Sequence, residues 1–154
     1  MKGVITVQIK KLPAYSKDVW ITIKGSDSYS SGDDDIELMT EGKLFIDNGR
    51  YMVEYDESPV TGMMGTRTSM SIDDGIITVV RRGKINSNFI FTKGQRQDSL
   101  YETEFGNLMM SVYTNDVDIN FDENGGEVKV EYQVDMANGF GKNYLHMLVK
   151  EVRN

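Results

Sequence analysis

The sequence contains no cysteine, one histidine, one tryptophan and only two prolines among its 154 residues. Without cysteine the chain cannot form disulfides, thiolate metal sites or a cysteine nucleophile, and this is compatible with a reducing compartment. No apolar run approaches the roughly 20 residues that a bilayer-spanning helix needs. Residues 4–10 alternate apolar and polar side chains, which predicts a strand rather than the apolar block of a signal peptide. We therefore expect a cytoplasmic protein.

Basic residues are also fewer than acidic ones. The chain has 24 acidic against 17 basic residues, for a formal net charge of −7. This balance argues against nucleic-acid binding, which needs a basic face, and against docking on anionic lipid. A helical period of apolar residues is missing as well, so the sequence favours an all-β protein.

The strongest local pattern is in residues 66–83, where alternating runs flank Asp74-Gly75. A two-residue Asp-Gly turn takes positive φ at both central positions and closes a twisted hairpin. The turn predicts that Ile72 faces Ile77, Met70 faces Val79 and Thr68 faces Arg81. The first two pairs are typical of a core, and the last places an arginine on the same inward face.

Two further dipeptides, Asn48-Gly49 and Asn124-Gly125, predict hairpins of the same kind. The first should pair Ile46 with Tyr51 and Leu44 with Val53, with Gly42 as a bulge or bend. The second should pair Phe121 with Val128, Ile119 with Val130 and Val117 with Tyr132. Further strands are expected at about 19–23, 89–92, 97–103, 108–114, 117–122 and 143–152.

About ten short strands with frequent turns imply an antiparallel meander. Closure removes the exposed edges of such a sheet, and about eight to ten strands can enclose a core or one small ligand. We expect a single domain over residues 1–154, folded as a closed or nearly closed up-and-down β-barrel. A variable polar segment is expected at about residues 12–35, as a short strand followed by a loop.

Several stretches together resemble a known family. In order they read ELMTEGKLF, YDESPVTGMMGTRTSMSI, VVRRGKINSNFIF, SLYETEFGNL, DENGGEVKVEY and GKNYLHMLVKEV, over about Ile36 to Val152. They resemble the bacterial family typified by YwiB, whose function is unknown. The resemblance implies a calycin-like, or lipocalin-like, β-barrel, and it implies no catalytic residues, because the family has no established activity.

Arg81 is the most informative candidate for a site. A buried arginine must be paired, and its guanidinium suits a carboxylate or phosphate. It could anchor an acidic head group of a small apolar or amphipathic ligand inside the barrel. It could equally form a structural ion pair with a carboxylate near Glu41 or Glu54, or emerge into solvent. The residues predicted to line the ligand cavity with Arg81 are Thr68, Met70, Tyr51, Tyr55 and Tyr132.

An enzyme has the weakest support. His146 is predicted to face outward, and a single outward histidine gives little support for a catalytic triad or a metal site. Residues 33–35 are three aspartates without the spacing of a calcium loop, and residues 61–65 lack a phosphate-loop pattern. We assign no catalytic residue, metal or cofactor.

The alternative to a ligand-binding barrel is an interaction module with a filled core. Apolar residues that face outward would then mark a homodimer or partner-protein surface. The residues predicted for that surface are Phe45, Met52, Val80 and Leu148.

Overall fold

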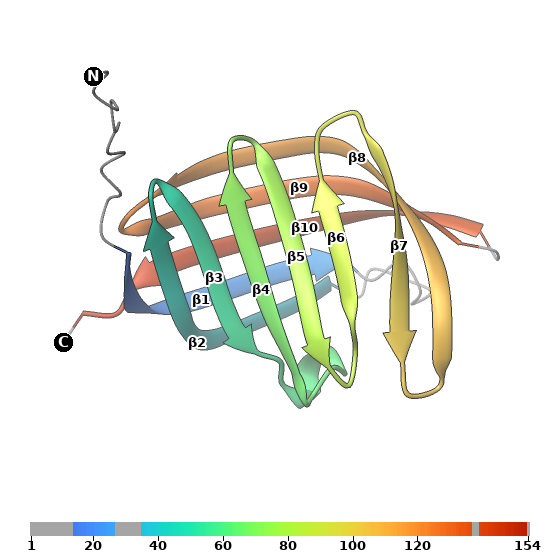
Figure 1. The fold of residues 1–154 in the computed structure, drawn as a ribbon, viewed down its shortest axis with the longest axis horizontal. Helices are drawn as coiled ribbons and strands as arrows, with labels where there is room; N and C mark the ends of the chain where they lie inside the picture. Colours follow the sequence, from blue (N-terminus) through green and yellow to red (C-terminus); the bar gives the residue numbers. More distant parts are fainter. Residues whose placement is uncertain (1–13, 27–34, 137–138, 154) are drawn as a thin grey trace, which may run out of the picture.

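The computed structural model describes residues 14–26, 35–136 and 139–153, and ten antiparallel strands make up most of it (Figure 1). The strands are β1 (Tyr15–Ser26), β2 (Asp35–Asp47), β3 (Arg50–Asp56), β4 (Thr66–Asp73), β5 (Ile76–Gly83), β6 (Ser87–Phe91), β7 (Arg96–Thr103), β8 (Gly106–Asp122), β9 (Gly125–Met136) and β10 (Gly139–Glu151). One turn of 3-10 helix, Pro59–Thr61, connects β3 to β4. Within the three described stretches, no helix has the length and apolarity needed to cross a membrane.

The strands form one sheet in the order β6-β5-β4-β3-β2-β1-β10-β9-β8-β7. The sheet curls so that β3 to β6 lie in front of β8 to β10 in Figure 1. Its edge strands, β6 and β7, form no regular ladder in the described chain; one isolated backbone bridge links them, in which Asn86, just before β6, and Glu102 exchange hydrogen bonds of 3.0 and 2.9 Å. The barrel is therefore nearly closed, as predicted, with its seam between β6 and β7.

Two hairpins have the predicted registers. Asn48 and Asp74 have φ of 53° and 48°, and the glycine after each has φ of 78° and 79°. Positive φ at both central positions matches the twist of the strands, which is why these dipeptides fix the turn. The observed pairs include Ile46 with Tyr51, Leu44 with Val53, Ile72 with Ile77, Met70 with Val79 and Thr68 with Arg81.

The register predicted for the third hairpin is wrong by two residues. The predicted pairs were Phe121–Val128, Ile119–Val130 and Val117–Tyr132, whereas the observed pairs are Phe121–Gly126, Ile119–Val128 and Val117–Val130. The turn is Glu123-Asn124, so Gly125 and Gly126 belong to β9. A Cβ on either glycine would overlap a backbone oxygen of a neighbouring strand, that of Val149 or Asn120. These glycines serve close strand contact rather than the turn.

Two strands are longer than the alternation suggested. Residues 108–114 and 117–122 were expected as separate strands, but both belong to β8, whose pairing with β9 shifts between Thr114 and Asp116. The alternation at 19–23 lies within the twelve-residue β1. The strand predicted at residues 4–10 lies outside the described residues.

Side chains of both sheet layers fill the interior. Val19, Ile21 and Leu44 have no exposed surface, and the rings of Phe91 and Tyr132 lie 5.0 Å apart. Gly42 lies where β2 stops pairing with β3, and a Cβ there would overlap Ile21 and the backbone oxygen of Glu54. The core at this position therefore depends on glycine.

Candidate functional site

Arg81 lies on the inward face of β5, opposite Thr68, as the turn predicted. Its side chain is 20% exposed, and its Nε lies 4.0 Å from Oε1 of Glu57, whose side chain is 1% exposed. The partner is thus a carboxylate near Glu54, three residues further along the chain, whereas Glu54 itself pairs with Arg67 at 2.8 Å. Arg81 is thus the positive charge that faces a buried carboxylate, and a carboxylate removed from water requires such compensation.

Hydroxyl groups complete the surroundings of Glu57. Thr68 Oγ1 donates to Oε1 at 2.6 Å, and Thr61 Oγ1 donates to Oε2 at 2.8 Å. Sequence reasoning missed Glu57, although the inward alternation of Val53 and Tyr55 continues to it two residues later. The cluster joins the end of β3 to β4, β5 and the 3-10 turn.

Tyr55 completes this cluster and should affect stability at high pH. Burial raises the pKa of Tyr55 above its usual 10.0, and the charge of Glu57 raises it further. In the unfolded chain Tyr55 loses its proton near pH 10.0, whereas in the folded protein it keeps the proton. The contribution of Tyr55 to the free energy of unfolding is therefore fully present below pH 10.0 and decreases above it. As pH rises above 10.0, we expect the free energy of unfolding to fall less in Tyr55→Phe than in the parent protein. Urea titration at each pH measures this free energy. Equal losses would contradict this, and Tyr113→Phe, on half-buried Tyr113, is the control.

Two buried polar atoms on β5 and β6 make no hydrogen bond within the described chain. Arg81 Nε and the Oγ of Ser87 are buried and make no hydrogen bond there. Arg81 and Ser87 are direct neighbours on β5 and β6. Ser87 also lines a cavity of about 530 Å³ at the β6–β7 seam, together with Asn88 and Ser99, whose Oγ donates to the Asn88 carbonyl at 2.5 Å.

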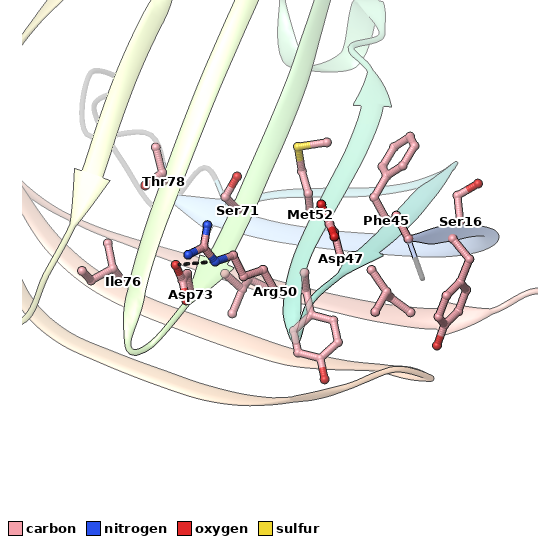
Figure 2. Close-up of a pocket in the computed structure, with 14 residues that line it drawn as sticks. Ser16, Phe45, Asp47, Arg50, Met52, Ser71, Asp73, Ile76 and Thr78 are labelled. Carbon is pink, nitrogen blue, oxygen red and sulfur yellow. Dashed lines mark ion pairs between the residues drawn. The ribbon is translucent and has the colours of Figure 1, made fainter. Parts of the chain in front are cut away.

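A larger cavity, of about 690 Å³, lies along β1 to β5 (Figure 2). A row of side chains directly opposite one another on successive strands crosses it: Ser16, Phe45, Met52, Ser71 and Thr78. Figure 2 shows Phe45, Met52, Ser71 and Thr78 on the same side of the strands. We call this row and its surroundings the outer groove.

Charged side chains at the hairpin tips border the outer groove. Asp47 lies opposite Arg50, and Arg50 Nε lies 3.3 Å from Asp73 Oδ2, the pair marked by the dashed line in Figure 2. Two carboxylates thus accompany one guanidinium. The rim carries a net negative charge, and the floor carries an aromatic ring and a thioether.

The structure places the six predicted ligand residues in different surroundings. Thr68 and Met70 are 1% exposed, and Tyr55 is buried beside Glu57. Tyr51 lines the outer groove, whereas Tyr132 lines a cavity of about 310 Å³ between β8, β9 and β10. Arg81 therefore shares a cluster with Thr68 and Tyr55 but shares no described cavity with Tyr51 or Tyr132.

The outward residues predicted for an interaction surface also separate into two groups. Phe45 and Met52 lie opposite each other and line the outer groove. Val80 and Leu148 are half-buried and are absent from the lining of that groove. The groove was missed by sequence reasoning because alternation shows which face a residue takes, whereas the hollow depends on how five strands, β1 to β5, lie together.

His146 lies on β10 with its Nε2 2.8 Å from Oε1 of Glu127 on β9. The hydrogen bond from Lys129 lowers the pKa of Glu127, and the contact with His146 lowers it further. Among the residues that the structure describes, no group of three or more His, Cys, Asp or Glu side chains is placed to hold a metal ion. Asp33 and Asp34 lie outside that part of the chain.

Comparison with known proteins agrees with this architecture. Residues 21–147 match the family described as "Domain of unknown function (DUF1934)". The chain belongs to this family. The match starts at residue 21, earlier than the resemblance at Ile36 suggested, and so includes part of β1.

The chain is also similar to a β-barrel protein of Bacillus subtilis. The "Uncharacterized beta-barrel protein YwiB" of Bacillus subtilis (strain 168) is 26% identical over 111 residues, which cover 72% of this chain and 75% of that protein. The crystal structure of the ywiB protein from Bacillus subtilis has a TM-score of 0.70 at 18% identity, over 91% of this chain and 94% of that one. At that identity the likeness supports the fold alone.

Proposed function

We propose that this protein is a non-enzymatic binding barrel that holds an apolar or amphipathic molecule in the outer groove. The observation that carries the proposal is the groove itself, about 690 Å³ along β1 to β5 with Phe45 and Met52 in its floor. Small-molecule sites have volumes of roughly 300–1,000 Å³ and largely apolar linings with a few polar groups. The interior beneath these strands is occupied by side chains such as Leu44 and Val53.

The rim indicates which polar group such a molecule would carry. Among the described residues that line the groove, Arg50 is the one cation, and it already pairs with Asp73 and faces Asp47 across the strands. A neutral or basic polar group would meet the remaining negative charge. The proposal is therefore a ligand with an apolar body and a neutral or basic end.

Nile red, a neutral apolar dye, tests the groove directly. We expect saturable binding at one dye per chain, seen as a blue shift in fluorescence, because the dye enters an apolar hollow. Phe45→Ser with Met52→Ser removes the apolar floor and should abolish the shift, whereas Val80→Ser, on the same sheet outside the groove, should retain it. Ser71→Trp, which fills the groove without removing apolar surface, should also block the dye. Binding that survives both groove variants would overturn the proposal.

A second candidate is the ligand site inside the barrel that the sequence predicted. Arg81 Nε and Ser87 Oγ support it, because neither makes a hydrogen bond within the described residues although buried polar atoms usually make one. Ser87 also lines the seam cavity. A small molecule with an acceptor group would satisfy both atoms. In this candidate function the ligand would bind inside the barrel, as in lipocalins. The cytoplasmic location expected from the sequence is part of the same proposal.

A further inference from the structure

We propose that two copies of this chain associate through the outer face of β2, β1 and β10. We call this face the β1 panel, and its nine side chains lie in three cross-strand rows. The rows are Glu41, Trp20 and Lys150; Met39, Thr22 and Leu148; and Glu37, Lys24 and His146. All nine lie outside the lining of the outer groove, so the inference goes beyond the proposed function.

Strand alternation places the β1 panel on the outside of the barrel. Val19 and Ile21 of β1 are buried, as are Met147 and Val149 of β10, so the residues between them face outward. On β2 the side chain of Met39 is 66% exposed. Because β1 lies between β2 and β10 in the sheet, the outward side chains form one continuous surface.

The centre of the panel is apolar. Trp20 is 41% exposed, and Met39 is its diagonal neighbour on the next strand. Leu148 lies in the same row as Met39, on the other side of Thr22. Diagonal neighbours on a sheet are within reach of an aromatic side chain. Tryptophan and methionine are enriched in protein interfaces, so this centre has the composition of an interaction surface.

Opposite charges flank Trp20. Glu41 of β2 lies directly opposite it on one side, and Lys150 of β10 lies directly opposite it on the other. Both side chains are exposed, and neither makes an ion pair within the described part of the chain. Each is therefore available to a charge on another molecule.

A two-fold axis parallel to β1 makes this surface complementary to itself. Rotation by 180° about such an axis exchanges the β2 side of the panel with the β10 side and leaves each row at its own level. Glu41 then faces Lys150 of the second copy, and Met39 faces Leu148 of the second copy. The two Trp20 rings meet on the axis. An interface between identical copies related by a two-fold axis requires this self-complementarity.

The charge pattern favours a second copy over other occupants. A surface for nucleic acid or anionic lipid would be basic throughout, whereas this panel carries both signs on opposite sides of an apolar centre. Sheets that pack face to face keep their strand directions within about 30° of each other, and an axis along β1 satisfies this condition.

The size of the panel predicts a weak and reversible dimer. Three strands are about 14 Å wide, and the rungs that β1 shares with β10, from Val19 to Gly25, extend about 24 Å. Two copies would thus bury roughly 700 Å² of sheet face in total, and interfaces below about 1,200 Å² are typical of transient association. We expect dimers at high protein concentration and monomers on dilution.

Charge reversal followed by sedimentation analysis tests the axis. Glu41→Lys makes both sides of the panel basic, and Lys150→Glu makes both sides acidic, so each variant alone should dissociate at least about tenfold more readily than the parent. An equimolar mixture of the two variants should associate again, because each basic side meets an acidic one. Asp118→Lys, the same charge change at an exposed position of β8 outside the panel, should behave as the parent does.

The emission of Trp20 reports contact at the panel directly, because Trp20 is the sole tryptophan of the chain. Its emission should shift to shorter wavelength as the parent protein is concentrated, and it should not shift in Glu41→Lys. A parent that stays monomeric at millimolar concentration would overturn the inference. A dimer that survives each single reversal would show contact through another face, which contradicts it. Two monomeric variants whose mixture does not associate would overturn the two-fold axis along β1.

Discussion

Replacing Arg81 with methionine is expected to lower the free energy of unfolding by about 3 kcal/mol, because it leaves the buried Glu57 carboxylate without a positive charge. The hydroxyls of Thr61 and Thr68 would remain, but they supply dipoles rather than a counter-charge. Urea unfolding at neutral pH measures the loss. This expectation differs from that of a ligand anchor alone, which would leave stability unchanged.

Two further variants separate the ion pair from simple packing. Glu57→Gln combined with Arg81→Met removes both charges and keeps an acceptor for Thr68, so it should recover most of the lost stability. Arg82→Met, at the exposed neighbouring position, should change stability by less than about 0.5 kcal/mol. If the double variant is as unstable as Arg81→Met, the loss does not come from an uncompensated carboxylate.

The same proteins address a ligand inside the barrel. Native mass spectrometry of freshly purified parent protein would show a discrete adduct that disappears on denaturation. If Arg81 Nε and Ser87 Oγ hold that molecule, the adduct should be lost from the folded double variant and retained in Arg82→Met. An adduct that persists without Arg81 would place the ligand elsewhere.

Gly126→Ala is expected to destabilise the protein by about 3 kcal/mol, since steric overlap adds to an unfavourable backbone conformation. Gly126 has a φ of 150°, and a Cβ there would overlap the backbone oxygen of Asn120 and lie 2.7 Å from the Cα of Phe121. Backbone atoms of a paired strand cannot move aside as the end of a flexible side chain can. Thermal unfolding of the variant measures the effect.

Gly49→Ala is the matched control for this substitution. Gly49 also has positive φ, at 78°, but nothing lies within 4 Å of the added Cβ. It should therefore cost only about 1 kcal/mol, which is the backbone penalty alone. Equal effects at the two glycines would show that close approach between β8 and β9 contributes little.

The contrast between these glycines also explains which parts of the fold were predictable. At Asn48-Gly49 and Asp74-Gly75 the local demand for positive φ fixes the turn, and the register follows from counting residues. At Asn124-Gly125 the same dipeptide misleads, because Gly125 lies against Val149 of β10, which is distant in sequence. The turn dipeptide predicts the hairpin correctly only where its glycine is not also needed for close contact with another strand.

The candidate sites divide along similar lines. Alternation placed Arg81 inward and Phe45 and Met52 outward, because strand parity is a local property. The pairing of Arg81 with Glu57 depends on the path of the chain after β3, and the outer groove depends on how five strands, β1 to β5, lie together. Neither the path nor the arrangement has a signature in residue spacing.

The seam between β6 and β7 has a consequence for the connectivity of the chain. The two edge strands are consecutive in sequence, while β1 and β10, from opposite ends of the described chain, pair in the middle of the sheet. Lys17 Nζ and Glu151 Oε1 lie 3.9 Å apart there. A circular permutant joined after β10 and opened between Phe91 and Arg96 would have every strand next to its sequence neighbour. Among the described strands, β1 and β10 are the paired neighbours that are not consecutive in sequence, and the permutant would join them directly. Its contact order would be lower, so we expect it to fold faster.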